Sequence, residues 1–285
     1  MQGGPKTALV LAGGGALGAV QVGMLRELVR AGQDFDMVVG ASAGAINGAF
    51  FAARPDLEGV RQLEAIWRGI ARRDVMPVDL SMLLNLALRR DYLCDGSALR
   101  RLLARNLHYG AIEHAALPLH IVATDMLSGE EVVLSRGPVV EAVLASASIP
   151  GIYPPVLIGG RLLVDGGVAS NAPISAAIRL GARKLFVLPT GFACVPKSLG
   201  RGAAAKAMQA INLLVARQLV SDIDRYAHHA EICVVPTLCP LEASAYDYTV
   251  CGELIDRAGE ATRDWILNGG LAERGISEML KEHAH

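Results

Sequence analysis

The sequence predicts an α/β fold, a three-layer α/β/α sandwich around a central, mostly parallel sheet. Two apolar runs, Ala8–Ala12 and Phe35–Val39, each lead into a glycine-containing turn and then into a helical pattern. This β-α-β-α order favours parallel strands with helices on both faces of the sheet. Of the 285 residues, 52% are hydrophobic and 19% are charged, which is enough apolar material for a large core. We expect a single domain over residues 1–285.

The first strand–helix unit runs from Ala8 to Gly32. The buried strand Ala8–Ala12 ends in Gly13, Gly14 and Gly15. Apolar residues then recur at helical spacing between Gly18 and Ala31, and Gly32 ends that helix. The second unit has the strand Phe35–Val39 and a helix over Ala45–Ala53.

The remaining elements continue the alternation. Helices are expected at Leu57–Arg72, Ala98–Asn106, Val139–Ala147, Pro173–Leu180, Ala203–Ile223 and Glu253 to about Leu267. Strands are expected at Leu119–Thr124, Glu131–Leu134, Arg161–Val164, Lys184–Leu188 and Ile232–Val235. The first two of these strands flank the turn Leu127–Gly129, which predicts a hairpin.

The apolar segment Leu80–Leu88, followed by Arg89 and Arg90, has two interpretations. It is either a core or interface helix, or a lid that contacts lipid and covers an apolar cleft, because large apolar patches are rare on soluble monomers.

Charge and cysteine usage exclude several classes of protein. With 27 basic and 28 acidic residues the formal net charge is −1, so we expect no nucleic-acid partner. The five cysteines form no C-x-x-C pair, which favours buried free thiols in a reducing compartment over a metal site or a disulfide framework. The first residues lack a secretory or myristoylation pattern, so a cytoplasmic protein is expected.

The segment Gly40–Gly44 has the G-x-S-x-G pattern of a nucleophile elbow between a strand and a helix. The flanking glycines, Gly40 and Gly44, leave room where a side chain would collide with neighbouring backbone. The free N–H groups and positive dipole at the helix start favour an anion at Ser42. Ser42 is therefore the predicted nucleophile.

Asp165 follows the strand Arg161–Val164 and precedes Gly166 and Gly167. Because ligands bind at the carboxyl ends of strands in parallel sheets, we expect Ser42, Asp165 and Gly13–Gly15 to converge. Asp165 is then a candidate base for the Ser42 hydroxyl. The N–H groups of Gly13, Gly14, Gly15 and Ala43 would form an oxyanion hole, with one good donor worth roughly 3–4 kcal/mol.

The spacing Gly13-x-Gly15-x-x-Gly18 also fits a dinucleotide-binding turn. That site needs an acidic residue where the second strand ends, to bind the ribose hydroxyls. Here the strand ends in Gly40-Ala41-Ser42, so we expect no cofactor.

A catalytic triad that uses His228 or His229 is a second alternative. In α/β-hydrolases the order is Ser, then Asp or Glu, then His, but Ser42 on the second strand is too early for that fold. Both histidines also lie in a polar helix tail. A Ser–Asp dyad needs neither of them.

These motifs together resemble the bacterial patatin-like phospholipases, a family of acyl hydrolases with a Ser–Asp dyad. Four segments correspond in the expected order: Gly13–Gly18, Gly40–Gly44, Ala145–Pro150 running on to Tyr153–Pro155, and Asp165–Gly167 running on to Asn171–Pro173. The resemblance covers about Thr7 to Leu188 and leaves 189–285 as a C-terminal extension. It implies a patatin-like fold in which Ser42 attacks the ester and Asp165 accepts the proton.

The resemblance also implies the substrate class and the partners. The substrate would be a carboxylic ester of a lipid: a phospholipid, a lysophospholipid or an acylglycerol. Transient contact with a membrane surface would follow, and no oligomeric state is implied. Many members of the family have Lys or Arg where this chain has Leu17, which removes a possible cationic contact to a phosphate head group. The alternative is a catalytically weak lipid-binding or scaffold protein that keeps the fold, although both members of the dyad are present.

Overall fold

The structure is a computed structural model that describes residues 6–77, 82, 88, 91–191, 203–239, 241 and 243–274. Within them, eight strands form one sheet in the order β5-β6-β3-β2-β1-β7-β8, and β4 pairs with β3. The parallel strands are β1 (Lys6–Leu11), β2 (Met37–Ala41), β3 (Leu119–Asp125), β7 (Ala182–Leu188) and β8 (Glu231–Val234). The prediction of a mostly parallel central sheet is confirmed.

The sheet is antiparallel at one end. There β4 (Glu131–Leu134) forms the predicted hairpin with β3, and β6 (Arg161–Asp165) also runs antiparallel to β3. The short edge strand β5 (Val156–Ile158), which the sequence pattern did not predict, pairs with β6.

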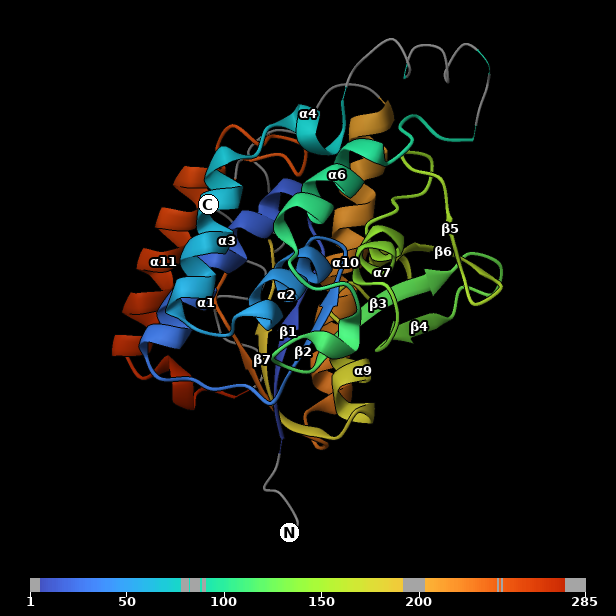
Figure 1. Cartoon of the computed structure of the whole chain (residues 1–285). Helices are drawn as coiled ribbons and strands as arrows, with labels where there is room; N and C mark the ends of the chain where they lie inside the picture. Colours follow the sequence, from blue (N-terminus) through green and yellow to red (C-terminus); the bar gives the residue numbers. More distant parts are fainter. Residues whose placement is uncertain are drawn as a thin grey trace.

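Helices cover both faces of the sheet (Figure 1). On one face lie α1 (Ala19–Arg30), α2 (Ala43–Ala53), α3 (Leu57–Gly69), α6 (Ser97–Asn106), α7 (Val139–Ser146) and α11 (Cys251–Leu267). On the other lie α9 (Ile174–Arg179) and α10 (Ala203–Tyr226). Successive side chains of β1 point to opposite faces, so Leu9 and Leu11 pack in the first core while Ala8 and Val10 pack in the second.

The predicted helix Leu57–Arg72 is interrupted. After α3 the backbone of Ile70 and Ala71 is extended, and the short helix α4 (Arg72–Val75) begins. The Asp74 carboxylate accepts the Ala71 N–H at 2.9 Å, which caps the new helix. A hydrophobic period alone does not reveal such a local capping bond.

The C-terminal region shares the main core. In α11, Ile255 and Ala258 are buried with α1, and a Cβ on Gly23 would lie 2.2 Å from the Ile255 carbonyl oxygen. Helices α1 and α11 can approach this closely because residue 23 is glycine and has no Cβ.

One cysteine prediction is wrong. Cys94, Cys233 and Cys251 are buried free thiols, as expected, but Cys239 is disulfide-bonded. Spacing along the chain does not reveal such a pairing.

Two further features bear on membrane contact. Of the predicted segment Leu80–Leu88 the structure describes only Met82 and Leu88, so the choice between core helix and lid lies outside the described residues. No helix in the described part of the chain has the length and apolar character needed to span a bilayer.

Candidate active site

Ser42 and Asp165, 123 residues apart in the sequence, meet in a hydrogen bond. The Ser42 hydroxyl Oγ donates to Asp165 Oδ2 at 2.7 Å. Both side chains are buried, with exposed fractions of 8% and 7%. The arrangement brings the predicted nucleophile and the predicted base within reach of one another.

The strand register explains this meeting, and the reason differs from the one inferred from the sequence. Because β6 is antiparallel to β3, a shared strand direction does not explain why the carboxyl end of β6 lies beside Ser42. Instead, Ala41 at the end of β2 pairs with Val122, and the next residue, Ala123, pairs with Asp165. Asp165 therefore lies level with the turn that carries Ser42.

The elbow around Ser42 is strained. Ser42 has φ 54° and ψ −121°, and it is the single non-glycine residue with positive φ in the described ranges. A Cβ on Gly40 would lie 2.4 Å from the Gly44 carbonyl oxygen, and one on Gly44 would lie 2.1 Å from the Leu11 carbonyl oxygen. The turn therefore has space for glycine alone at both flanks.

The end of α7 holds both members of the pair. The Ser42 N–H donates to Ser146 Oγ at 2.9 Å, and the Ser146 hydroxyl donates to the Val122 carbonyl. The Asp165 N–H donates to the Ser148 carbonyl at 2.9 Å. Sequence reasoning assigned Ser146 no role of its own, and the one signal was its place in the Ala145–Pro150 segment of the family resemblance.

Burial controls the protonation of Asp165 and raises the pKa of this carboxyl to about 6. The hydrogen bonds from Ser42 and from the Gly167 N–H, at 2.8 Å to Oδ1, lower the pKa and so limit the rise. Within the described ranges no cation forms an ion pair with Asp165. Asp165 is thus a carboxylate whose proton affinity suits a base near neutral pH.

The glycine turn after β1 divides into two parts. The Gly13 N–H already donates to the Asn171 carbonyl at 3.0 Å, and the Gly13 carbonyl accepts the Thr190 hydroxyl at 2.6 Å. The Gly13 N–H is therefore not free for an oxyanion, contrary to the expectation from the sequence. The N–H groups of Gly14, Gly15 and Ala43 meet no acceptor among the residues described, and they remain available.

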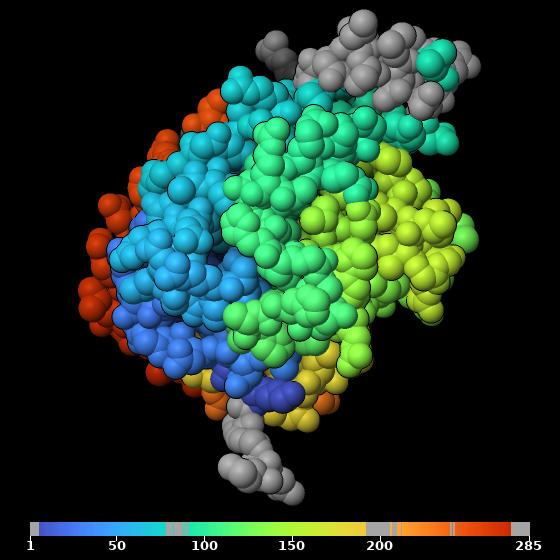
Figure 2. Space-filling view, in the orientation of Figure 1, coloured from blue at the N-terminus to red at the C-terminus, as the bar shows by residue number. Residues whose placement is uncertain are grey.

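An apolar pocket adjoins Ser42, Ala43 and Gly15. Its remaining lining is contributed by α2, α3, α4, α6 and the loops that adjoin α4, follow α7 and precede α11: Ile46, Phe50, Ile66, Trp67, Ile70, Val75, Met76, Leu99, Leu102, Ala147, Ile149, Tyr153, Ala245, Tyr246 and Tyr248. Figure 2 shows the surfaces of α3 and α6 side by side over this part of the molecule. The cavity volume is about 50 Å³, so a long acyl chain enters only when lining side chains move.

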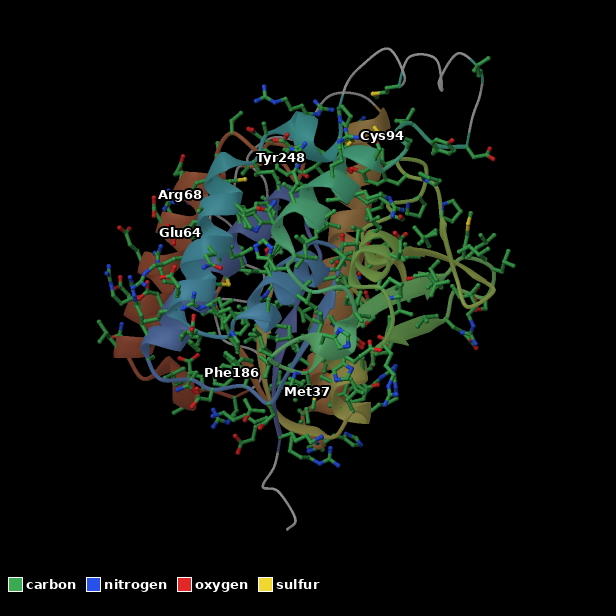
Figure 3. The ribbon with its side chains drawn as sticks, viewed as in Figure 1. Met37, Glu64, Arg68, Cys94, Phe186 and Tyr248 are labelled. Atoms are coloured by element: carbon green, nitrogen blue, oxygen red, sulfur yellow. The ribbon has the colours of Figure 1, made fainter. Side chains whose placement is uncertain are left out.

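Part of this lining comes from the C-terminal region, where no sequence motif predicted a functional role. The Ala16 N–H donates to the Ala245 carbonyl at 2.8 Å, which fixes the segment before α11 to the glycine turn. Figure 3 places Tyr248 and Cys94 toward one end of the molecule, and Met37, at the start of β2, toward the other. Tertiary contacts of this kind leave no local pattern in a sequence.

The histidines of the alternative triad lie elsewhere. His228 and His229 lie just before β8, which is parallel to β7, so they lie at the amino-end edge of the sheet, opposite Ser42.

Gly18, the last glycine of the dinucleotide pattern, packs closely against α2. A Cβ on Gly18 would lie 2.8 Å from the Cβ of Ala43. No cluster of three or more potential metal ligands occurs in the ranges that the structure describes.

Comparisons with known proteins give a family model, sequence relatives and a solved structure that are similar to this chain. The family model Patatin-like phospholipase matches residues 9–178. An uncharacterized NTE family protein of Mycobacterium tuberculosis is 36% identical over 201 residues, which cover 68% of this chain and 33% of the relative. Patatin-like phospholipase domain-containing protein 7 of Rattus norvegicus is 31% identical over 190 residues, which cover 66% of this chain and 14% of the relative. The alignment with the crystal structure of VipD from Legionella pneumophila has a TM-score of 0.49 and 16% identity, and covers 94% of this chain and 67% of that one. The chain spans a third or less of the length of the relatives from Mycobacterium tuberculosis and Rattus norvegicus.

Proposed function

This chain belongs to the patatin-like phospholipase family, and from that premise we propose that it hydrolyses carboxylic esters of lipids through a Ser42–Asp165 dyad. The observation that carries the proposal is the 2.7 Å hydrogen bond from Ser42 Oγ to Asp165 Oδ2, beside an apolar pocket. A hydroxyl held by a buried carboxylate at the start of a helix has the geometry of an activated nucleophile.

In the proposed reaction the Ser42 oxygen attacks the ester carbonyl carbon while its proton passes to Asp165. The bond from that carbon to the alcohol oxygen then breaks, and the alcohol leaves with the proton from Asp165. Water attacks the acyl-enzyme in the same way, giving its proton to Asp165 and releasing the acid and free Ser42. No cofactor takes part.

The proposed oxyanion donors are the N–H groups of Gly14, Gly15 and Ala43. Ala43 is the first residue of α2, so its N–H has no acceptor within the helix, and the positive end of the helix dipole lies beside it. Gly15 and Ala43 both line the pocket with Ser42. Donors from two different turns suit the negative charge of a tetrahedral intermediate.

The pocket lining indicates an acyl chain on the acid side of the ester. Leu17 packs against the main core, so this position offers no cation to a phosphate group. We therefore propose an acylglycerol, a lysophospholipid or a phospholipid as substrate, without a strong requirement for phosphate. A cytoplasmic location with transient contact to a membrane surface remains a prediction from the sequence.

A fluorophosphonate probe is expected to label the protein on Ser42 alone, because the dyad activates this hydroxyl. The measurement is intact-mass spectrometry followed by peptide mapping. Ser42→Ala should abolish labelling, whereas Ser148→Ala, which removes a hydroxyl bonded to the Leu144 carbonyl, should retain it. Full labelling of Ser42→Ala would contradict the assignment, and no labelling of the unaltered protein would favour a lipid-binding scaffold.

Ester hydrolysis is expected to lose activity in acid with an apparent pKa near 6. Asp165 must be ionised to accept the Ser42 proton, and burial raises its pKa to about 6, so kcat/KM should fall about tenfold per pH unit below that value. Initial rates on a soluble ester, measured with thermal denaturation at each pH, test this. An acid limb near the ordinary Asp value in a folded protein would show that the carboxyl is not perturbed.

A further inference from the structure

Tyr246 lies at the candidate active site but outside residues 9–178, which the family model matches. It lines the same pocket as Ser42, and its side chain is half-buried. The backbone around it is fixed, because the Ala245 carbonyl accepts the Ala16 N–H and the Tyr246 N–H donates to Ser244 Oγ at 3.2 Å. The C-terminal region thus places a phenol at the active site.

The Tyr246 hydroxyl is available to a ligand. Its ring packs against the buried cluster of Met76, Cys94 and Tyr153. The Tyr153 hydroxyl is already donated to the Val75 carbonyl at 2.8 Å, whereas the Tyr246 hydroxyl bonds to none of the described residues. Packing already holds the ring in place. Its free O–H can therefore donate to a bound molecule with little further loss of side-chain conformational entropy.

Tyr246 shares the pocket with Ser42, whose hydroxyl is hydrogen-bonded to Asp165. Burial raises the pKa of its phenol, and the nearby Asp165 charge raises that pKa further. The phenol therefore stays protonated and acts as a donor at neutral pH. Tyr153 and Tyr248 line the same pocket but are far more buried, with exposed fractions of 5% and 8%.

We propose that Tyr246 is a catalytic residue that donates a hydrogen bond to the alcohol oxygen of the ester as this oxygen leaves. The inference rests on the proposed function, because it assigns the half-exposed side of the pocket to the alcohol part of the lipid ester. The leaving oxygen must lie within reach of Asp165, which protonates it, and Tyr246 lines the pocket in which that oxygen leaves Ser42.

The step needs no further reactant. When the bond between the carbonyl carbon and the alcohol oxygen breaks, its electron pair goes to that oxygen. The proton that Asp165 took from Ser42 is transferred to the same oxygen, and Asp165 becomes a carboxylate again. Tyr246 keeps its own proton throughout and stabilises the developing negative charge.

The test compares two esters of one short acid, an ethyl ester and a p-nitrophenyl ester. The ethoxide oxygen is a poor leaving group that needs stabilisation, whereas p-nitrophenolate leaves without it. Tyr246→Phe is expected to lower kcat/KM about tenfold for the ethyl ester and less than about twofold for the p-nitrophenyl ester. The control is Tyr226→Phe, a half-buried tyrosine at the end of α10, which should change neither value.

A series of aryl esters with leaving groups of decreasing acidity gives a second measure. In Tyr246→Phe the dependence of kcat/KM on leaving-group acidity should become steeper. An equal loss on both esters with an unchanged melting temperature, or no loss on either, would overturn the role on the leaving group. If the unaltered protein hydrolyses no ester in a Ser42-dependent manner, the proposed function itself fails, and this role fails with it.

Discussion

Asp165→Asn is expected to lose about a thousandfold in kcat/KM while remaining folded. The amide is nearly isosteric with the carboxyl and its oxygen can still accept the Gly167 N–H, but it cannot accept the Ser42 proton. Steady-state hydrolysis of a soluble ester, with active-site titration to exclude contaminating activity, measures the loss.

The same substitution is expected to make the protein more stable at neutral pH. Burial raises the pKa of Asp165 from 3.8 to about 6, so the folded state holds a proton that the unfolded chain releases. The free energy of unfolding of the unaltered protein therefore falls as pH rises from about 4 through about 6, by an amount on the order of 1–3 kcal/mol. Asparagine has no such dependence, and denaturant unfolding at pH values on either side of this window measures the difference.

A matched control is Asp56→Asn. Asp56 caps α3 by accepting the Gly59 N–H at 2.8 Å, and that bond holds the pKa of the Asp56 carboxyl below its usual range. Its contribution to stability is present above the ordinary Asp pKa and is lost in acid, the opposite sign from Asp165. Asp56→Asn should reduce stability slightly at neutral pH and leave hydrolysis unchanged. If Asp165→Asn also destabilised the protein at neutral pH, the burial penalty on Asp165 would be absent.

The sequence predicted the elements whose signals are local. Glycines on both sides of Ser42 and the alternation of apolar and helical runs give the parallel part of the sheet, because turn sterics and burial act over a few residues. The direction of β6 was not predictable in this way. Whether Arg161–Asp165 runs with or against β3 depends on the path of the chain between Ala147 and Val156, where prolines and glycines leave no periodic signal.

The site shows the same division. Ser42 and Asp165 were predicted to lie close together because each adjoins glycines at the end of a strand, and they are hydrogen-bonded. The occupied Gly13 N–H depends on a hydrogen bond to Asn171, and the position of Tyr246 depends on the bond from Ala16 to Ala245. Each of these contacts joins residues more than 150 positions apart, and the pattern of either partner alone does not contain it.

The turn between β2 and α2 is expected to tolerate no side chain at Gly44, so Gly44→Ala should lose about 3 kcal/mol of unfolding free energy and most activity. The new Cβ would lie 2.1 Å from the Leu11 carbonyl oxygen and 2.8 Å from that of Ala12, and this backbone leads directly into the glycine turn. Denaturant unfolding and kcat/KM measure the two effects. Alanine stabilises a helix by about 1 kcal/mol relative to glycine, so a net loss of unfolding free energy must come from the steric collision of the new Cβ.

Gly69→Ala at the end of α3 is the control, since a Cβ there meets nothing within 4 Å and the variant should be at least as stable as the original. A stable and active Gly44→Ala variant would mean that α2 does not approach β1 this closely, and Ser42 would then lack the support that sets its backbone angles.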